Sequence, residues 1–353
     1  MEPTESLCQR QHLARPHRGR CEEIVRDLVG LQAQSPEVPA LSLWTRRARF
    51  RPELLERAML RERTLVKTWA MRGTLHVLRT EDLALILPTI KAATLARMRE
   101  HMVKLGYDPA GRTHARLRER LLRIFAQPTE RSLAGERAGI SDTRLLWLLC
   151  AELSAMGRLL HVDMRAGKSI LADRREWIGE VGTVPAREAL GRLLVRYLRG
   201  YAPATMRDFA HWSGLKAALV RAARAAAGDQ VRAEGDDLFP AQETRRRSVS
   251  RLPVRLLPRF DPFLLGHREK SHYLDARFRQ RVYRPVAEVA AVILIDGRVG
   301  GTWRQVKRAT FLDIDLHPFH PIARSDRTAV EALALDVAAQ RGLAIGRVSW
   351  RQP

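Results

Sequence analysis

The sequence has little cysteine and little lysine, and it has no long hydrophobic run. Its three cysteines, Cys8, Cys21 and Cys150, form no Cys-x-x-Cys pair and are odd in number, which excludes a disulfide framework and a zinc ribbon. The longest uninterrupted apolar segment, residues 289–295, is far shorter than the roughly 20 residues of a membrane-spanning helix. The first twenty residues are polar and lack the apolar core of a signal peptide. We therefore expect a cytoplasmic protein with reduced thiols.

Acidic residues are also scarce relative to basic ones. Over 353 residues the chain carries 62 Lys+Arg against 39 Asp+Glu, a net charge of +23. Such a balance favours a polyanionic partner, nucleic acid before an anionic membrane. Only seven of the cations are lysine, a bias that a GC-rich genome would also produce. A hydrophobic content of 45% excludes general disorder, and the length is typical of two or three domains.

Three predicted helices followed by a β-hairpin occur three times along the chain. In the first cycle the hairpin strands, residues 65–70 and 74–78, flank Met71-Arg72-Gly73. The predicted helices of the three cycles cover residues 21–31, 41–48 and 53–60, then 114–126, 132–138 and 142–156, then 186–199, 204–212 and 215–227. The later hairpins are predicted at residues 158–173 and 230–241. A three-helix unit that ends in a hairpin is typical of the winged helix, a helix-turn-helix variant that binds DNA.

The composition changes at residue 251, after which strands predominate. Strands are predicted at residues 252–257, 287–295 and 310–316, with a turn at Asp296-Gly297-Arg298, and a closing helix is predicted at residues 329–341. We therefore divide the chain into winged-helix units at residues 1–110, 111–182 and 183–250 and a β-rich region at 251–353. The irregular stretch 261–283 contains His267 and Arg268 and is too long for an ordinary connection, so we expect it to have a function.

Two apparent motifs are better explained without chemistry. Gly167-Lys168-Ser169 resembles the end of a phosphate-binding loop, but Val162 stands where that motif needs its first glycine. Asp313, Asp315, His317 and His320 resemble metal ligands, yet aspartates that alternate along a strand are usually its solvated face. We expect neither a nucleotide cofactor nor a metal.

Basic residues gather at the predicted hairpins, where this fold usually contacts DNA phosphates. Arg72 lies in the first hairpin, Lys168 in the second, and Arg245, Arg246 and Arg247 follow the third. Solvated loop charges are the alternative explanation.

Five collinear segments resemble the winged-helix DNA glycosylase superfamily of the AlkZ and YcaQ type. The first runs from Leu28 to Gln34 with the sequence LVGLQAQ, and the second from Val66 to His76 with the sequence VKTWAMRGTLH. The other three are YAPATMRDFAHWSG at residues 201–214, LPRFDPFLLG at 257–266 and GTWR at 301–304. The resemblance extends from about Gln9 to the C-terminus without large gaps.

The resemblance implies an α+β, mainly helical protein with three tandem winged helices in a C-shape and a β-rich C-terminal region. It also implies excision of N7-alkylated purines, with unhooking of interstrand crosslinks by some members. The signature is Gln-Φ-Gln or Gln-Φ-Asp, where Φ is apolar, and Gln32-Ala33-Gln34 fits the first form. The Gln-Φ-Gln branch resembles self-resistance enzymes that accompany genotoxic natural products. Without this resemblance two glutamines would be a polar helix end, because glutamine is neither acid, base nor nucleophile.

We therefore expect a monomeric, metal-independent and cofactor-free DNA glycosylase that acts on alkylated or crosslinked double-stranded DNA in the nucleoid. Gln32 and Gln34 are the predicted catalytic residues. The predicted DNA-binding residues are Arg72, His76, Lys168, Arg245, Arg246, Arg247, His267, Arg268, Trp303 and Arg304. The alternative is a non-enzymatic winged-helix regulator, which three unlike units in one chain fit poorly because regulators usually dimerise on a palindrome.

Overall fold

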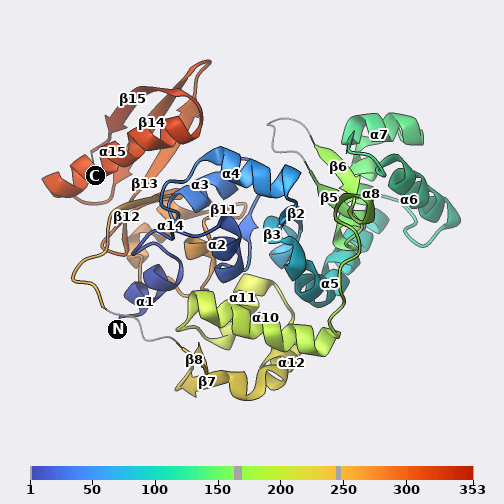
Figure 1. Ribbon diagram of the computed structural model, residues 1–353, viewed down its shortest axis with the longest axis horizontal. Helices are drawn as coiled ribbons and strands as arrows, with labels where there is room; N and C mark the ends of the chain where they lie inside the picture. The colour runs from blue at the N-terminus through green and yellow to red at the C-terminus, as the bar shows by residue number, and fades with distance from the viewer. Residues whose placement is uncertain (1, 163–168, 244–247, 353) are drawn as a thin grey trace. The chain divides into compact units, whose positions relative to one another are not determined.

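The computed structural model describes residues 2–162, 169–243 and 248–352, and Figure 1 shows its helices and strands. The chain divides into two compact units. The first unit contains Met1–Leu54, Val195–Trp212 and Asp229–Pro353, and the second contains Leu55–Leu194 and Ser213–Gly228. The mainly helical α+β class is confirmed. The units cut across the predicted boundaries, so the division into three winged helices stays a prediction. In the described part of the chain no helix has the length and apolarity to cross a membrane.

The first unit contains a five-stranded sheet built from the C-terminal part of the chain. Its order is β15 (Ala344–Trp350), β14 (Phe311–Pro318), β13 (Arg298–Lys307), β12 (Ala291–Ile295) and β9 (Arg255–Leu257). All neighbours are antiparallel except β14 and β15, which α15 (Arg324–Gln340) connects as a parallel crossover. The tight turn between β12 and β13 has positive φ at Asp296 and Gly297, as the predicted Asp-Gly turn requires.

Short helices from the N-terminus complete this unit. They are α1 (Pro3–Arg10), α2 (Cys21–Asp27) and α3 (Val38–Trp44), joined later in the chain by the end of α10 (Ala186–Tyr201) and by α11 (Met206–Ser213). The small hairpin of β7 (Val231–Glu234) and β8 (Asp237–Pro240) also belongs to this unit. The predicted irregular stretch 261–283 contains α13 (Pro262–Leu265) and α14 (Arg279–Val282), followed by the hairpin of β10 (Tyr283–Arg284) and β11 (Glu288–Val289).

The second unit contains the first two of the three predicted hairpins. In the first, β2 (Leu65–Trp69) pairs with β3 (Leu75–Arg79), and in the second, β5 (Leu159–His161) pairs with β6 (Ile170–Asp173). The hairpins join through Lys67 opposite His161, and β4 (Thr129–Glu130) extends the sheet beside β6. The predicted hairpin at Met71-Arg72-Gly73 is thus confirmed.

Helices α5 (Leu83–Lys104), α6 (Arg112–Ile124), α7 (Arg131–Ala138) and α8 (Thr143–Ala155) form the body of the second unit, and α12 (Ala217–Ala227) belongs to it as well. The buried carboxylate of Glu152 on α8 ties three of them together. It lies 2.7 Å from His114 Nε2 on α6 and 3.2 Å from Arg99 Nε on α5. Asp142 caps α8 by accepting from the backbone N–H of Arg144 at 2.8 Å.

One predicted helix is too long, and one helix was not predicted. The predicted helix at residues 21–31 ends at Asp27, because Val29 and Gly30 adopt positive φ of 55° and 109° and turn the chain into the short strand β1 (Leu31–Gln32). The 22-residue helix α5 was not predicted, because its apolar residues do not keep to one face and Pro88 interrupts its sequence.

A buried ion pair holds the first unit together. Both side chains of Arg46, just after α3, and Asp261, just before α13, are fully buried. Arg46 Nη1 and Nη2 donate to the two carboxylate oxygens of Asp261 at 2.8 and 2.6 Å. Ser42 Oγ also donates to Asp261, at 3.2 Å, and Arg46 Nη2 donates to Gln11 Oε1 at 3.4 Å. The pair therefore links α3 to the segment that begins α13.

Because removal of one partner leaves the other charge buried and unpaired, Asp261→Ala should lower the free energy of unfolding by about 3–5 kcal/mol. Denaturant unfolding followed by circular dichroism measures this. The control is Glu188→Ala, which removes a half-exposed partner of Arg192 on α10 and should cost at most about 1 kcal/mol. Equal losses in the two variants would contradict the central role of the Arg46–Asp261 pair.

Candidate active site

The segment Gln32-Ala33-Gln34 follows a tight reversal of the chain at the end of α2. The backbone N–H of Gly30 donates to Val25 O at 2.9 Å, which closes the reversal. A φ of 109° at Gly30 is one that residues with a side chain rarely adopt. Leu31, Gln32 and Ala33 are then buried, Gln32 with 7% of its surface exposed, whereas Gln34 is exposed. The two glutamines thus lie in different environments, one fixed in the protein and one presented at its surface.

The end of α10 packs directly against this reversal. Tyr201 OH donates to Leu28 O at 3.0 Å, and a Cβ added to Gly200 would lie 2.2 Å from Asp27 O. Tyr201 stacks on Tyr197 with ring centroids 4.9 Å apart. Residues 28–34 and residues 201–214, which are far apart in the sequence, are therefore in direct contact.

Histidines and carboxylates surround the same reversal. His12 Nε2 lies 2.9 Å from Asp27 Oδ2, and His17 contacts Glu23. Burial raises the pKa of the Asp27 carboxyl, but the hydrogen bonds from His12 and Arg26 outweigh it and lower the pKa overall. Asp27 is therefore ionised at neutral pH and helps to fix the end of α2 five residues before Gln32.

Several predicted DNA-binding residues are buried. His267 is 5% exposed, and its Nε2 lies 2.9 and 3.1 Å from the carbonyl oxygens of Tyr201 and Pro203, so that it donates to them. Burial lowers its pKa and keeps the ring neutral. Trp303 is 4% exposed and donates from Nε1 to Leu257 O at 2.9 Å. Both residues support the fold, and their contact with DNA stays a prediction.

Two other predicted DNA-binding residues, Arg268 and Arg304, lie at the surface of the first unit. Arg268 is exposed, and its backbone N–H donates to Asp208 Oδ1 at 2.7 Å. The side chain of Arg304 on β13 is 62% exposed and pairs with Asp315 on β14 at 2.7 Å. Asp315 is therefore the ion-pair partner of Arg304.

Arg72 and His76 belong to the second unit. Arg72 is half-buried with a φ of 57° in the turn between β2 and β3. His76 is 3% exposed, with Nδ1 3.0 Å from Thr74 O. Burial and the neighbouring Arg72 charge lower the pKa of His76 to about 3, so its ring is neutral. Lys168, Arg245, Arg246 and Arg247 lie outside the described residues.

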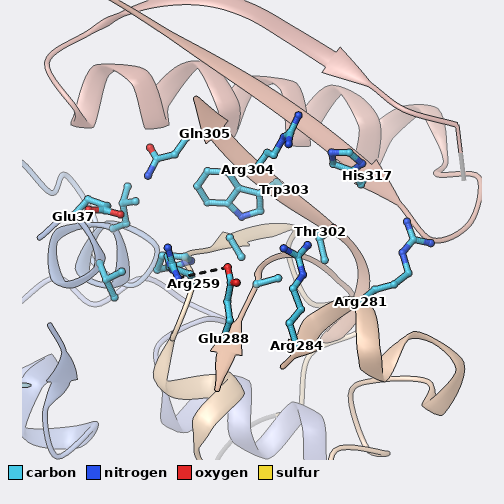
Figure 2. A pocket seen from close by; sticks show the side chains of 15 residues that line it. Glu37, Arg259, Arg281, Arg284, Glu288, Thr302, Trp303, Arg304, Gln305 and His317 are labelled. Carbon is cyan, nitrogen blue, oxygen red and sulfur yellow. Dashed lines mark ion pairs between the residues drawn. The ribbon is translucent and has the colours of Figure 1, made fainter. Parts of the chain in front are cut away.

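A cavity of about 500 Å³ in the first unit was not predicted from the sequence (Figure 2). It opens where α3, the β10–β11 hairpin and strands β13 and β14 meet. The charged and polar side chains that line it are Glu37, Arg259, Arg281, Arg284, Glu288, Thr302, Arg304, Gln305 and His317. The only sequence signal for it is the run of arginines at residues 277–284 in the stretch expected to have a function. Across the described ranges, no group of His, Cys, Asp and Glu side chains is arranged to hold a metal.

Comparison with known proteins gives one consistent result. The family model described as DNA glycosylase AlkZ-like matches residues 25–340. The chain is similar to an interstrand DNA cross-link repair glycosylase of Streptomyces sahachiroi, with 28% identity over 356 residues that cover 95% of this chain and 94% of the relative. The solved structure of the Streptomyces sahachiroi DNA glycosylase AlkZ matches with a TM-score of 0.80 and 25% identity over 99% of this chain and 98% of that chain.

Gly30→Ala should destabilise the reversal before Gln32, because alanine at this φ costs about 1–3 kcal/mol. The free energy of unfolding from urea denaturation measures the loss. Gly182→Ala is the matched control, since a Cβ there meets no atom within 4 Å and the backbone has ordinary φ. If the two substitutions had the same effect, the reversal would not depend on the glycine backbone.

Proposed function

Because the chain belongs to the AlkZ-like DNA glycosylase family, we propose that it hydrolyses the N-glycosidic bond of N7-alkylated purines in double-stranded DNA. The observation that carries the proposal is the placement of Gln32-Ala33-Gln34 on a rigid reversal, inside the matched region of a strongly basic chain. The name of its Streptomyces sahachiroi relative supports interstrand crosslinks as a further substrate. Self-resistance to a genotoxic natural product is the biological role that we propose with it.

The chemistry needs little help at the leaving group. An N7-alkylguanine is already cationic, so its glycosidic electron pair leaves with the base, which departs neutral and needs no general acid. A water molecule then forms the new bond to C1′ and loses a proton to the surrounding solvent. Oriented dipoles that face the positive charge developing on the sugar lower the barrier.

Two amide side chains can supply those dipoles. The carbonyl oxygen of an exposed Gln34 would accept a hydrogen bond from the attacking water, and Gln32 would direct its own carbonyl from a buried position. One oriented group of this kind contributes on the order of 10²–10³ in rate. An amide is also not repelled by DNA phosphates, as a carboxylate would be.

Basic side chains would hold the DNA. The described candidates are the exposed Arg268 and Arg304 and the half-buried Arg72. Lys168, Arg245, Arg246 and Arg247 are further candidates by sequence and lie outside the described residues. Phosphate contacts of this type fix the position of a protein on DNA without reading its sequence. A crosslinked guanine stays tethered to the opposite strand and cannot rotate fully out of the duplex, so the enzyme must reach the sugar in place.

The purified protein should release N7-methylguanine from methylated duplex DNA in the presence of EDTA, with alkali-labile abasic sites as the readout. No general acid or metal enters the proposed step, so chelation should leave the rate unchanged. A non-enzymatic regulator would bind the DNA and leave it intact. Complete loss on chelation, restored by one metal, would contradict the proposed mechanism.

Gln34→Ala should lower the single-turnover excision rate by about 10²–10³ while affinity for lesion-containing DNA changes only a few-fold. Gln32→Ala should have a similar effect on rate, with some loss of stability because Gln32 is buried. Gln34→Asp should restore excision above the level of Gln34→Ala, since a carboxylate also orients water. Gln127→Ala, at an exposed position of the second unit, is the control. Equal losses in rate and affinity would place the glutamines in the binding surface instead.

Affinity for undamaged duplex should fall steeply with salt if the arginines hold phosphates. Six contacts give a slope of log affinity against log salt of about −5, at roughly 0.9 per phosphate. Changing Arg245, Arg246 and Arg247 together to alanine should flatten the slope by about one unit for each residue that contacts DNA. Fluorescence anisotropy between low and moderate salt measures it. A parent slope near zero would show that the net charge does not serve DNA binding.

A further inference from the structure

The cavity of the first unit carries an excess of positive charge at one end. Figure 2 shows Arg281 and Arg284 on the same side of Trp303 as His317. Arg259 pairs with Glu288 at 3.5 Å, and Arg304 pairs with Asp315 at 2.7 Å. Neither Arg281 nor Arg284 has a carboxylate partner within the ranges that the structure covers, and both are exposed. Two exposed guanidinium groups without a carboxylate partner, beside one cavity, are suited to a phosphate, which guanidinium groups bind with paired N–H donors.

The other end of the cavity is apolar with a polar edge. Val38 and Leu41 of α3 line it together with the Trp303 indole. Gln305 and Glu37 lie on the opposite side of Trp303 from the two arginines (Figure 2). Gln305 Oε1 is buried and has no hydrogen-bond partner in the described structure. A buried acceptor without a partner is uncommon in native proteins, and a bound ligand is one way to satisfy it.

From these two ends we infer that the cavity binds a nucleotide, with its phosphate at Arg281 and Arg284 and its base beside Trp303 and Gln305. The volume of about 500 Å³ lies within the range of small-molecule sites. An amide and a carboxylate at the base end offer both a donor and acceptors to the edge of a base.

The site is close to the proposed catalytic segment along the chain. Glu37 follows Gln34 by three residues, so their Cα atoms are at most about 11 Å apart. One nucleotide step in DNA is about 3.4 Å, so the cavity is within reach of a nucleotide a few positions from the reacting sugar. This inference rests on the proposed function when the nucleotide belongs to DNA. A free mononucleotide presents the same chemistry and does not depend on it.

Equilibrium dialysis with labelled dGMP, deoxyguanosine and inorganic phosphate tests the site without any excision reaction. We expect dGMP to bind with one site per chain and deoxyguanosine to bind at least tenfold more weakly. Arg281→Ala/Arg284→Ala should lower dGMP affinity at least tenfold. The control, Arg324→Ala/Arg347→Ala, removes the same charge from exposed positions outside the cavity and should leave dGMP binding unchanged. Since Arg281 lies over the Phe319 ring, the single variant Arg284→Ala provides a second test that leaves this contact intact.

DNA with one unpaired, bulged nucleotide distinguishes the two sources of ligand. If the nucleotide is part of DNA, the double variant should lose at least tenfold more affinity for the bulged duplex than for a fully paired one, relative to the control. If the site serves a free nucleotide, the variant should lose dGMP affinity alone. Failure of the parent protein to bind either dGMP or the bulge preferentially would overturn the inference. Loss of N7-methylguanine release with intact dGMP binding would contradict the proposed function and leave the site standing.

Discussion

The buried pair of Arg46 and Asp261 is the constraint on which the first unit depends. A fully desolvated ion pair is tolerated only where further hydrogen bonds complete it, and here Ser42 and Gln11 do so. Gln11 in turn donates to Gly200 O at 3.3 Å, at the end of α10 that supports the reversal after α2. One polar network therefore connects α3, the start of α13 and the element that positions Gln32.

The same network determines what surrounds the cavity. Helix α3 begins four residues after Gln34 and lines the cavity with Val38 and Leu41, while Arg46 lies just past its end. Asp261 also accepts from the backbone N–H of Phe263 at 3.0 Å and so starts α13. A shift of α3 would move both the glutamine segment and the cavity wall. The proposed catalytic and nucleotide sites thus adjoin the same short helix, α3.

The sequence predicted the features that local rules determine. The hairpin at Met71-Arg72-Gly73 and the turn at Asp296-Gly297 both follow from residues that permit or require a positive φ. It did not predict the surroundings of His267 or Trp303, because their hydrogen-bond partners lie 66 and 46 residues away. A basic or aromatic residue in a motif can support the fold or bind a ligand, and only its tertiary contacts distinguish these two roles.

In the mechanism that we propose for Gln32 and Gln34, an amide suits a protein of this charge. A carboxylate at an exposed position in a chain of net charge +23 would attract arginines and compete with DNA phosphate for them. An amide orients water through its dipole and leaves the cationic surface available to DNA. Its weakness as a catalyst matters little where the scissile bond is already activated by the charge of the alkylated base. In this proposal a neutral dipole helps only when its direction is fixed, and the tight reversal at Val29 and Gly30 would fix that direction.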